Sequence, residues 1–317
     1  MYDIVALGEL LIDFTAQSVD AQGYPTMAAH AGGAPANFLA AAAKYGGKTA
    51  LLAKVGADAF GRLLTGTLHK AGIDTRGIVA SDDFFTTLAF VTLDKTGDRE
   101  FSFARKPGAD TQLSAGELAT ELLDEARAFH FGTLSLTDEP AAAATRYAVD
   151  YARRRGALIS FDPNLRKPLW KSEAAAREQM LWGLAQADVV KISDEEVDFL
   201  FSLGAEAGAR YLLEHFPVRL ALVTCGADGC YFRSRTASGH VGSLTGLRVV
   251  DTTGAGDIFG GSALYKLLQT GKQPEALSEA ELRAIVAYAC TAAALSTEKP
   301  GGISSVPEEA EVLAALA

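Results

Sequence analysis

The segment with the clearest chemical character is the small-residue run at positions 249–257, VVDTTGAGD. An apolar helical stretch begins at Ile258, so we predict that a short strand enters this loop and that a helix leaves it. Backbone N–H groups that converge at a helix N-terminus favour a bound phosphate. Asp257 would lie in the first helical turn, where its carboxylate can accept a proton from an attacking hydroxyl. On local grounds alone, Asp257 can equally be an N-terminal cap.

Two other glycine patterns fail the tests for common phosphate-binding motifs. The dinucleotide-binding pattern GxGxxG is broken because Phe259 stands in place of its third glycine. The tripeptide GKT at positions 47–49 imitates the end of a Walker A loop, but Ala42 replaces the required first glycine. A predicted helix also precedes this tripeptide and a predicted strand follows it, which reverses the order of a P-loop.

Two polar segments near the start of the sequence could bind a polyol. Asp13 follows an apolar run at residues 4–7, and residues 31–37 (AGGAPAN) open a predicted helix through a second small-residue loop. In open α/β sheets, ligands gather at the carboxyl ends of the strands. A carboxylate, bare glycine backbone and the Asn37 amide would together offer several hydrogen-bond partners. Asp13 as a turn residue and Asn37 as a capping residue are the local alternatives.

A predicted hairpin interrupts the alternation of strands and helices. Its strands are residues 87–93 and 99–105, and the turn-rich segment 94–98 (DKTGD) connects them. Period-2 alternation places Phe101, Phe103 and Arg105 on one face. Such a face would suit a flap that covers a polar ligand, or it could pack its aromatic rings on the core and leave Arg105 in solvent.

The remaining pattern is typical of a mostly parallel sheet covered by helices on both faces. Continuous apolar strands alternate with Ala-rich amphipathic helices almost throughout. We predict strands at residues 4–7, 49–55, 157–161, 189–192, 220–224 and 249–250. We predict helices at residues 36–45, 140–155 and 258–268.

Composition excludes several classes of function. With a net charge of −10 over 317 residues, the chain lacks the basic surplus that a nucleic-acid binder needs. Three cysteines and five scattered histidines show no zinc-binding spacing and no disulfide framework, which favours a reducing cytoplasm. The acidic first residues are untypical of a signal peptide, and the uncharged stretch 21–43 contains too many Pro, Gly and polar residues for a membrane span.

Taken together, the loops at 31–37 and 251–257 resemble the two signatures of the ribokinase-like, or PfkB, carbohydrate kinases, in the same order and at suitable spacing. The resemblance covers nearly the whole chain. It implies one domain over residues 1–317: a three-layer α/β/α sandwich with a mostly parallel central sheet and a small β-sheet lid from about 13–30 and 86–105. It also implies that Asp257 is the catalytic base and that Gly254, Ala255 and Gly256 form an anion hole.

The resemblance further assigns binding residues one by one. Positions matching sugar contacts of the family, together with the hairpin face, are Asp13, Gly32, Gly33, Asn37, Phe103, Arg105 and Arg166. Those matching the ATP site are Lys191, Ser193, Thr224, Gly226, Gly229 and Cys290, with Ser193 and Cys290 each replacing a family Asn. Glu196 corresponds to a Glu that acts indirectly on Mg²⁺. A monovalent-cation loop, for K⁺, is implied at Asp251, Thr253, Ser296, Gly301 and Ser305.

Four segments narrow the choice of sugar. Residues 8–14, 102–110, 162–166 and 191–196 look most like those of bacterial fructokinases, which implies ATP-dependent phosphorylation of the primary hydroxyl of fructose. Asn164 and Arg166 follow a predicted strand, at the ligand edge, although Asp-Pro-Asn is also a good turn. The alternative is a 2-keto-3-deoxygluconate kinase, in which Arg105 or Arg166 would meet the carboxylate; a non-catalytic carbohydrate sensor is the alternative from another class. The exposed hairpin also suggests a homodimer.

Overall fold

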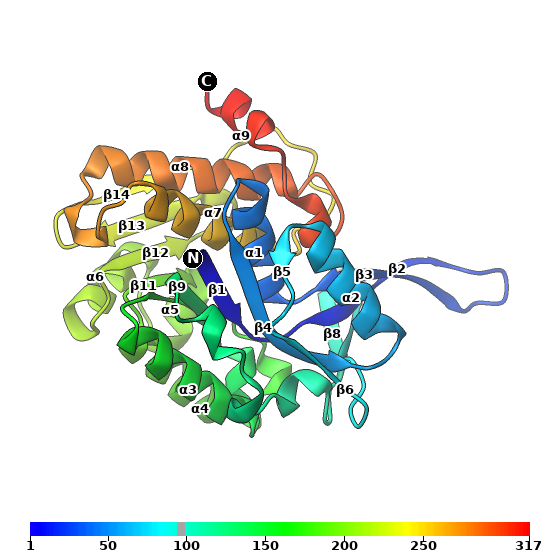
Figure 1. The fold of residues 1–317 in the computed structure, drawn as a ribbon. Helices are drawn as coiled ribbons and strands as arrows, with labels where there is room; N and C mark the ends of the chain where they lie inside the picture. Colours follow the sequence, from blue (N-terminus) through cyan, green and yellow to red (C-terminus); the bar gives the residue numbers. More distant parts are fainter. Residues whose placement is uncertain (94–98) are drawn as a thin grey trace.

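The computed structural model describes residues 1–93 and 99–317, and the side chains of all of these except 93 and 99–101. Within them the chain forms two separate sheets and a set of helices that cover the larger sheet on both faces (Figure 1). The predicted connection at 94–98 and the predicted position of the Phe101 side chain lie outside the described residues.

The larger sheet is mostly parallel, as the apolar strand pattern predicts. Among the described residues it contains ten strands in the order β14-β13-β12-β11-β10-β9-β1-β4-β5, with β6 paired to β4. In the part of this sheet that the structure describes, only the β12–β13 and β13–β14 pairs are antiparallel. The strands are β1 (Tyr2–Leu7), β4 (Thr49–Gly56), β5 (Ile73–Asp74), β6 (Ile78–Ser81), β9 (Ala126–Gly132), β10 (Leu158–Asp162), β11 (Val189–Ser193), β12 (Leu220–Thr224), β13 (Cys230–Ser234) and β14 (Ser238–Val241).

Helices form a layer on each face of this sheet, because alternate residues of the buried strands point to opposite sides. Ile4 and Ala6 face one apolar cluster, whereas Val5 and Leu7 face the other. The first cluster is covered by α1 (Ala34–Lys44), α2 (Ala59–Lys70), α7 (Ala255–Gln269), α8 (Glu279–Ser296) and α9 (Glu309–Leu316). The second is covered by α3 (Ala141–Arg154), α4 (Glu173–Gln186), α5 (Asp194–Phe201) and α6 (Ala205–His215). No helix of the described chain is long and apolar enough to cross a membrane.

The smaller sheet stands apart from the central one and contains the predicted hairpin. Its order is β3-β2-β7-β8, and its strands are β2 (Leu11–Val19), β3 (Pro25–Gly32), β7 (Leu88–Leu93) and β8 (Arg99–Ala104). Part of β2 and β3 projects from the body as a two-stranded arm (Figure 1). Phe14 anchors the base of this sheet, because its ring stacks on Phe90 and meets the edge of Phe60 in α2.

Most predicted elements are confirmed, and one is wrong. The predicted strands at 4–7, 49–55, 157–161, 189–192 and 220–224 and all three predicted helices are present. The predicted strand at 249–250 is absent: Val249 and Val250 are 62% and 55% exposed, and no strand of the described chain pairs with them. The backbone N–H of Val250 instead donates to the Thr297 carbonyl. Two β-branched residues therefore lead into the helix through an irregular loop.

Candidate active site

Two cavities meet at the loop that opens α7. The first has a volume of about 280 Å³ and is lined by residues of the front loops, the small sheet, the carboxyl ends of β10 and β11, and the α7 loop. The second, of about 560 Å³, is lined by parts of the segments 224–229 and 243–249, excluding Asp228 and Arg248, and by the adjoining faces of α7 and α8. Thr252 and Gly256 line both, so this loop is the junction between them.

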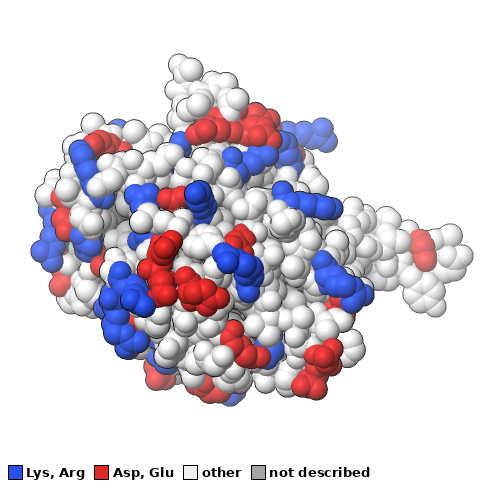
Figure 2. Space-filling model, viewed as in Figure 1, with Lys and Arg blue, Asp and Glu red and all other residues white. Residues whose placement is uncertain are grey.

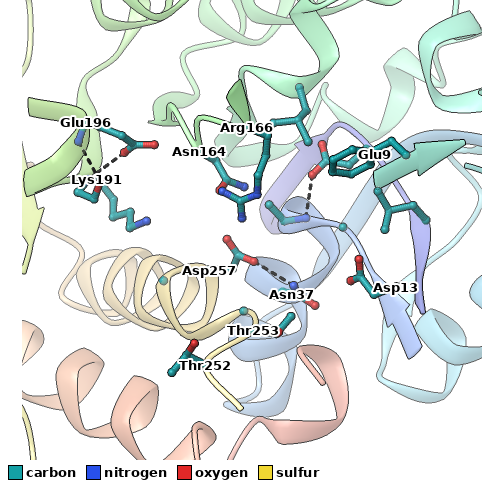
Figure 3. A pocket seen from close by; sticks show the side chains of 18 residues that line it. Glu9, Asp13, Asn37, Asn164, Arg166, Lys191, Glu196, Thr252, Thr253 and Asp257 are labelled. Atoms are coloured by element: carbon teal, nitrogen blue, oxygen red, sulfur yellow. Dashed lines mark hydrogen bonds between the residues drawn. The ribbon is translucent and has the colours of Figure 1, made fainter. Parts of the chain in front are cut away.

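Asp257 lies in the first turn of α7, as predicted, and lines the first cavity. Gly254 immediately precedes the helix in the left-handed region, with a φ of 76°, which a glycine adopts without strain. No side chain that the structure describes caps the start of this helix, so Asp257 is not acting as its N-cap. Its carboxylate is instead turned into the cavity (Figure 3).

Asn37 fixes the Asp257 carboxylate. Its Nδ2 donates to Asp257 Oδ2 at 2.9 Å across two packed helices, α1 and α7. Burial raises the pKa of Asp257, while the Asn37 hydrogen bond and the charges of Lys191 and Arg166 act in the opposite direction. A buried carboxyl with a raised pKa is a better proton acceptor than an exposed one, which suits a general base.

Asp13 and Gly33 line the side of the first cavity next to the small sheet, whereas Gly32 does not line it. Asp13 lines the cavity from β2, and Gly32 lies beside it at the end of β3. A β-carbon at position 32 would collide with the Asp13 carboxylate, so only glycine leaves room for that carboxylate. Gly33, which lines the cavity, has a φ of 114°. Burial raises the pKa of Asp13 to about 7, against the opposing charge of Arg166.

Of the two hairpin side chains that were predicted to contact the sugar and that the structure describes, Phe103 and Arg105, one lines the cavity. Phe103 lines the first cavity, but Arg105 is not among the lining residues. Arg105 is 6% exposed, which also excludes the alternative that leaves it in solvent. Its Nε donates to Asp110 at 2.7 Å, and its other nitrogens reach Thr137 and the Leu134 carbonyl. Arg105 therefore ties the base of the small sheet to the body of the protein.

Asn164 and Arg166 both line the first cavity, where they follow the end of β10. Figure 3 shows both side chains directed into the space above Asp257. Asn164 has a φ of 45°, an unusual conformation for a residue other than glycine and one that clusters at functional sites. The Asp162 carboxylate supports this turn by accepting from the Asn164 backbone N–H at 3.1 Å.

Lys191, Ser193 and Glu196 reach the cavity from the end of β11 and the start of α5. Ser193 and Glu196 form a capping box, in which each side chain accepts from the other residue's backbone N–H. The second Glu196 oxygen accepts from the Leu165 backbone N–H at 2.7 Å. The Lys191 ammonium pairs with Asp162 at 3.0 Å.

The second cavity contains four of the six predicted nucleotide residues, and the other two, Lys191 and Ser193, line the first cavity instead. The four are Thr224, Gly226, Gly229 and Cys290, and Ala255 of the predicted anion hole lines the second cavity with them. Its described lining includes no Asp, Glu, Lys, Arg or His, and much of it consists of small and apolar residues. Such a wall suits the flat, weakly polar face of a nucleobase better than it suits a sugar.

The predicted cation loop is only partly assembled around Asp251. One Asp251 oxygen accepts from the Thr253 backbone N–H and the other from that of Gly301, each at 2.9 Å. Ser296 and Ser305 are buried, and each hydroxyl donates to a carbonyl three residues earlier in its own segment. Among the described residues, no group of three or more His, Cys, Asp or Glu side chains could hold a metal ion.

Two buried residues at or beside the cavity, Glu9 and Asp162, received no role from the sequence, and a third, Asn164, was placed only at the ligand edge. Glu9, Asp162 and Asn164 are all buried there, and Glu9 and Asn164 line the cavity. The Glu9 carboxylate accepts from the Ala34 backbone N–H, the start of α1, at 2.9 Å. The sequence placed each of them close to a predicted site residue. Glu9 stands between Gly8 and Asp13, and Asp162 and Asn164 share a segment with Arg166.

This arrangement matches a known family along almost the whole sequence. Residues 1–309 match the model of the pfkB family carbohydrate kinases. The chain therefore belongs to this family of sugar kinases.

Individual relatives extend the likeness. The chain is 42% identical over 314 residues to Fructokinase-1 of Zea mays, covering 98% of this chain and 96% of the maize protein. It is 40% identical over 316 residues to Fructokinase-2 of Solanum lycopersicum, covering 99% and 95% of the two chains. The crystal structure of a fructokinase from Xylella fastidiosa with bound ATP aligns with a TM-score of 0.91 at 33% identity, covering 100% of this chain and 98% of that one. A Vibrio cholerae O395 fructokinase double mutant bound to fructose, ADP and potassium ion aligns with a TM-score of 0.87 at 29% identity, covering 100% and 99%.

Proposed function

We propose that this protein is an ATP-dependent fructokinase, which converts D-fructose to fructose 6-phosphate. The observation that carries the proposal is the position of Asp257: a buried carboxylate, held by Asn37, at the loop that both cavities share. The polar cavity would hold the sugar, and the apolar cavity would hold the nucleotide. The named fructokinases that resemble the chain over nearly its full length support the choice of fructose.

The proposed reaction is an in-line transfer of the γ-phosphoryl group. Fructose lies against Asp13 and Asn37, with its primary hydroxyl directed at Asp257. Asp257 accepts the hydroxyl proton, the freed oxygen bonds to the γ-phosphorus, and the bond from that phosphorus to the bridging oxygen of ADP breaks. The backbone N–H groups of the 254–256 loop would stabilise the charge that develops on the phosphoryl oxygens.

Mg²⁺ fits this site as a nucleotide-borne ion and not as one caged by the protein. The described residues provide no metal-holding cluster, and both Glu196 oxygens already accept backbone N–H groups. Mg²⁺ commonly keeps several waters and is held largely by substrate phosphates. We propose that Glu196 acts on it through water, and that the ion, when bound, draws charge from the phosphoryl oxygens.

The domain organisation, the role of the small sheet, a potassium site and the cellular location are also part of this proposal. The chain would form one kinase domain, and its small sheet would close over the sugar and exclude water, with Phe103 facing the ligand. A K⁺ ion near Asp251, which the Vibrio structure's bound potassium suggests, would support the 251–257 loop. The reducing cytoplasm is the proposed location, because it suits three unpaired thiols.

A homodimer through the small sheet is also proposed. The projecting arm exposes Val19 and Tyr24, and residues 11–32 contain neither Lys nor Arg. Figure 2 shows the arm as largely uncharged on the visible face. A second copy could cover such a surface without charge repulsion. Light scattering that finds only monomer at micromolar concentration would defeat this part of the proposal.

The direct test is an assay of ADP release with MgATP and fructose, 2-keto-3-deoxygluconate, ribose, adenosine or no sugar. A clear preference for fructose supports the proposal. Preference for the keto-deoxy acid would instead assign its carboxylate to Arg166, because Arg105 is committed to Asp110 and does not line the cavity. Sugar binding without any turnover would favour a non-catalytic sensor.

A further inference from the structure

Glu9 stands where the chain leaves the central sheet and enters the small one. It lies in the short connection between β1 and β2 and is only 4% exposed. It lines the first cavity, and Figure 3 shows its carboxylate joined by a hydrogen bond to the backbone of a neighbouring segment. That segment is the start of α1, 25 positions later in the sequence, where the predicted sugar loop lies.

Within the described chain, no local side chain caps the start of α1. Its N-cap residue is Gly33, which has no side chain to accept a backbone N–H, and Pro35 in the first turn has no N–H to donate. The N–H of Ala34, the first helical residue, donates to Glu9 Oε1 at 2.9 Å. By contrast, α4 is capped by Ser172, the residue just before it. Glu9 therefore supplies from another part of the chain the cap that α4 has locally, and a carboxylate also suits the positive end of a helix.

A glycine is required at the N-cap position of α1, which explains why the cap comes from elsewhere. Gly33 has a φ of 114°, in a region that glycine adopts without strain and other residues avoid. A β-carbon at position 33 would also lie 2.3 Å from the Glu9 carbonyl oxygen. The usual capping residues Ser, Thr, Asp and Asn do not fit here, because each has a β-carbon. Glu9 therefore contacts the loop twice, with its carbonyl against Gly33 and its carboxylate on Ala34.

The residues that Glu9 holds form one wall of the first cavity. Gly33, Ala34 and Asn37 all line it. Asn37 lies one turn after Ala34, and its amide donates to the Asp257 carboxylate at 2.9 Å. A shift at the start of α1 would therefore move a predicted sugar contact and loosen the hydrogen bond on the proposed base.

The carboxyl group of Glu9 is enclosed by charged and titratable groups from several elements. Arg105 and Asp110 act on its pKa in opposite directions, and burial raises this pKa to about 7. Behind the carboxyl group lies a cavity of about 10 Å³, with room for one water molecule at most, which His130 and Asp162 also line. The hydrogen bond to α1 requires an acceptor oxygen at the right reach, and both the ionised and the protonated carboxyl group provide one.

We propose that Glu9 is a positioning residue for the sugar: its side chain holds the start of α1, and thereby Gly33 and Asn37, at the wall of the first cavity. This deepens the proposed function and rests on it. A Glu9 that instead contacted a sugar hydroxyl directly would affect sugar binding without affecting the base, so experiment can tell the two roles apart.

Two conservative variants separate the reach of the Glu9 side chain from its charge. Glu9→Asp keeps the charge but withdraws the carboxyl group by one methylene, so we expect the sugar KM to rise by about tenfold and the ATP KM to stay near wild type. Glu9→Gln keeps an acceptor oxygen at the same reach, so its sugar KM should stay within about threefold of wild type. A sugar KM that rises as much in Glu9→Gln as in Glu9→Asp, or that stays at wild type in Glu9→Asp, would overturn the proposal.

Ser172→Ala is the matched control for these kinetics. It removes the cap of α4, a helix of which no described residue lines either cavity. The variant should lower Tm and leave the sugar KM at its wild-type value, because the loss of a cap by itself affects only stability. A sugar KM raised as much as in Glu9→Asp would show that general destabilisation accounts for the Glu9 effect.

Hydrogen exchange tests the restraint on α1 without any substrate. In mass spectrometry of peptides that cover the start of α1, Glu9→Asp should speed exchange of the Ala34 amide by about tenfold, because the hydrogen bond to it is lengthened. Glu9→Gln should leave this exchange near wild type. Exchange at the wild-type rate in Glu9→Asp would refute the restraint. If the wild-type protein fails to phosphorylate fructose but exchange still rises in Glu9→Asp, the fructokinase assignment is wrong and the restraint by Glu9 stands.

The pH dependence of kcat distinguishes positioning from direct sugar contact. The Asn37 hydrogen bond acts to lower the pKa of Asp257, so a retreat of Asn37 in Glu9→Asp should raise this pKa. The acidic limb of the kcat profile, where Asp257 becomes protonated, should then move to higher pH, and Glu9→Gln should leave it in place. A limb that stays at its wild-type position in Glu9→Asp, despite a raised sugar KM, would show that Glu9 contacts the sugar itself and would overturn the positioning role.

Discussion

The two cavities differ sharply in chemistry although they share a loop. Six ionisable side chains line the first, namely Glu9, Asp13, Arg166, Lys191, Glu196 and Asp257. The described lining of the second has no acidic, basic or histidine side chain. The first is held by directed hydrogen bonds such as Asn37 to Asp257, whereas the second is formed by small residues that leave space.

This difference indicates that the first cavity orients the reacting groups and that the second binds the part of the substrate that does not react. A polar, desolvated cavity fixes the orientation of a hydroxyl and sets the pKa of its base, which is what a transfer reaction requires. An apolar cavity of small residues holds the non-reacting end of a substrate by shape and burial. Substitutions in the two cavities should therefore separate cleanly between kcat or sugar KM on one side and ATP KM on the other.

The largest effect on kcat is expected from a substitution of Asp257, in the loop that the two cavities share. Asp257→Asn keeps the shape of the side chain but removes the proton acceptor, so kcat should fall by about 10²- to 10⁴-fold. Sugar and ATP affinities should stay near wild type in calorimetric titrations. Wild-type turnover in this variant would remove Asp257 from the role of base.

A smaller effect is expected from Gly32→Ala. The new β-carbon would occupy the place of the Asp13 carboxylate, so this carboxylate must move. Because a small displacement of a group that positions the sugar weakens its hold, moving the Asp13 carboxylate should raise the sugar KM by about 10- to 100-fold. The ATP KM should stay unchanged. Gly66→Ala is the matched control, because a β-carbon at that helical position meets no atom within 4 Å. Equal sugar KM values for the two variants would contradict this account of Gly32.

The reciprocal prediction concerns the second cavity. Cys290 lies in its wall, and Cys290→Phe would fill space that the nucleotide needs. We expect the ATP KM to rise by about tenfold with no change in the affinity for sugar, which steady-state kinetics and a sugar titration would measure. Cys290→Ala should stay close to wild type. A rise in sugar KM instead would show that the two cavities are not separable.

The smallest effect concerns stability and pH. Burial raises the pKa of Glu9 from 4.5 to about 7, so the ionised form is disfavoured in the folded protein. Its stabilising contribution is present below pH 4.5 and is lost as the pH rises through 7. Without ligands, the wild-type Tm should fall more between pH 5 and 8 than that of Glu9→Gln, by about 3–6 °C.

Glu117→Gln is the control for this pH experiment. Burial acts to raise the pKa of Glu117, but hydrogen bonds from Lys54 and Ser114 outweigh it and lower this pKa. Its titration then lies below pH 5, so the change in Tm between pH 5 and 8 should match wild type. The same slope for Glu9→Gln and wild type would show that Glu9 does not titrate in this range.

The sequence predicted what depends on local pattern. The buried strands and the turn-to-helix loop at 254–257 were recoverable because periodicity and glycine placement act over a few residues. The strand at 249–250 failed because β-branched residues form a strand only where a partner strand exists. The sequence did not reveal the pairing of Lys191 with Asp162, because the two residues lie 29 positions apart. Nor did it show that Arg105 pairs with Asp110 and so does not reach the predicted sugar site. Such choices depend on which polar groups the fold brings together.

The order of the cavity residues along the chain has a consequence for how new substrates can be acquired. The walls formed by Glu9, Asp13, Asn37 and Phe103 come from the first third of the chain, whereas every described residue that lines the second cavity lies after position 223. A gene recombined between positions 196 and 224 would exchange every lining residue of the first cavity that precedes the α7 loop and keep the second cavity intact. Relatives with different sugars could therefore arise by inheritance of whole segments, without gradual change at every contact.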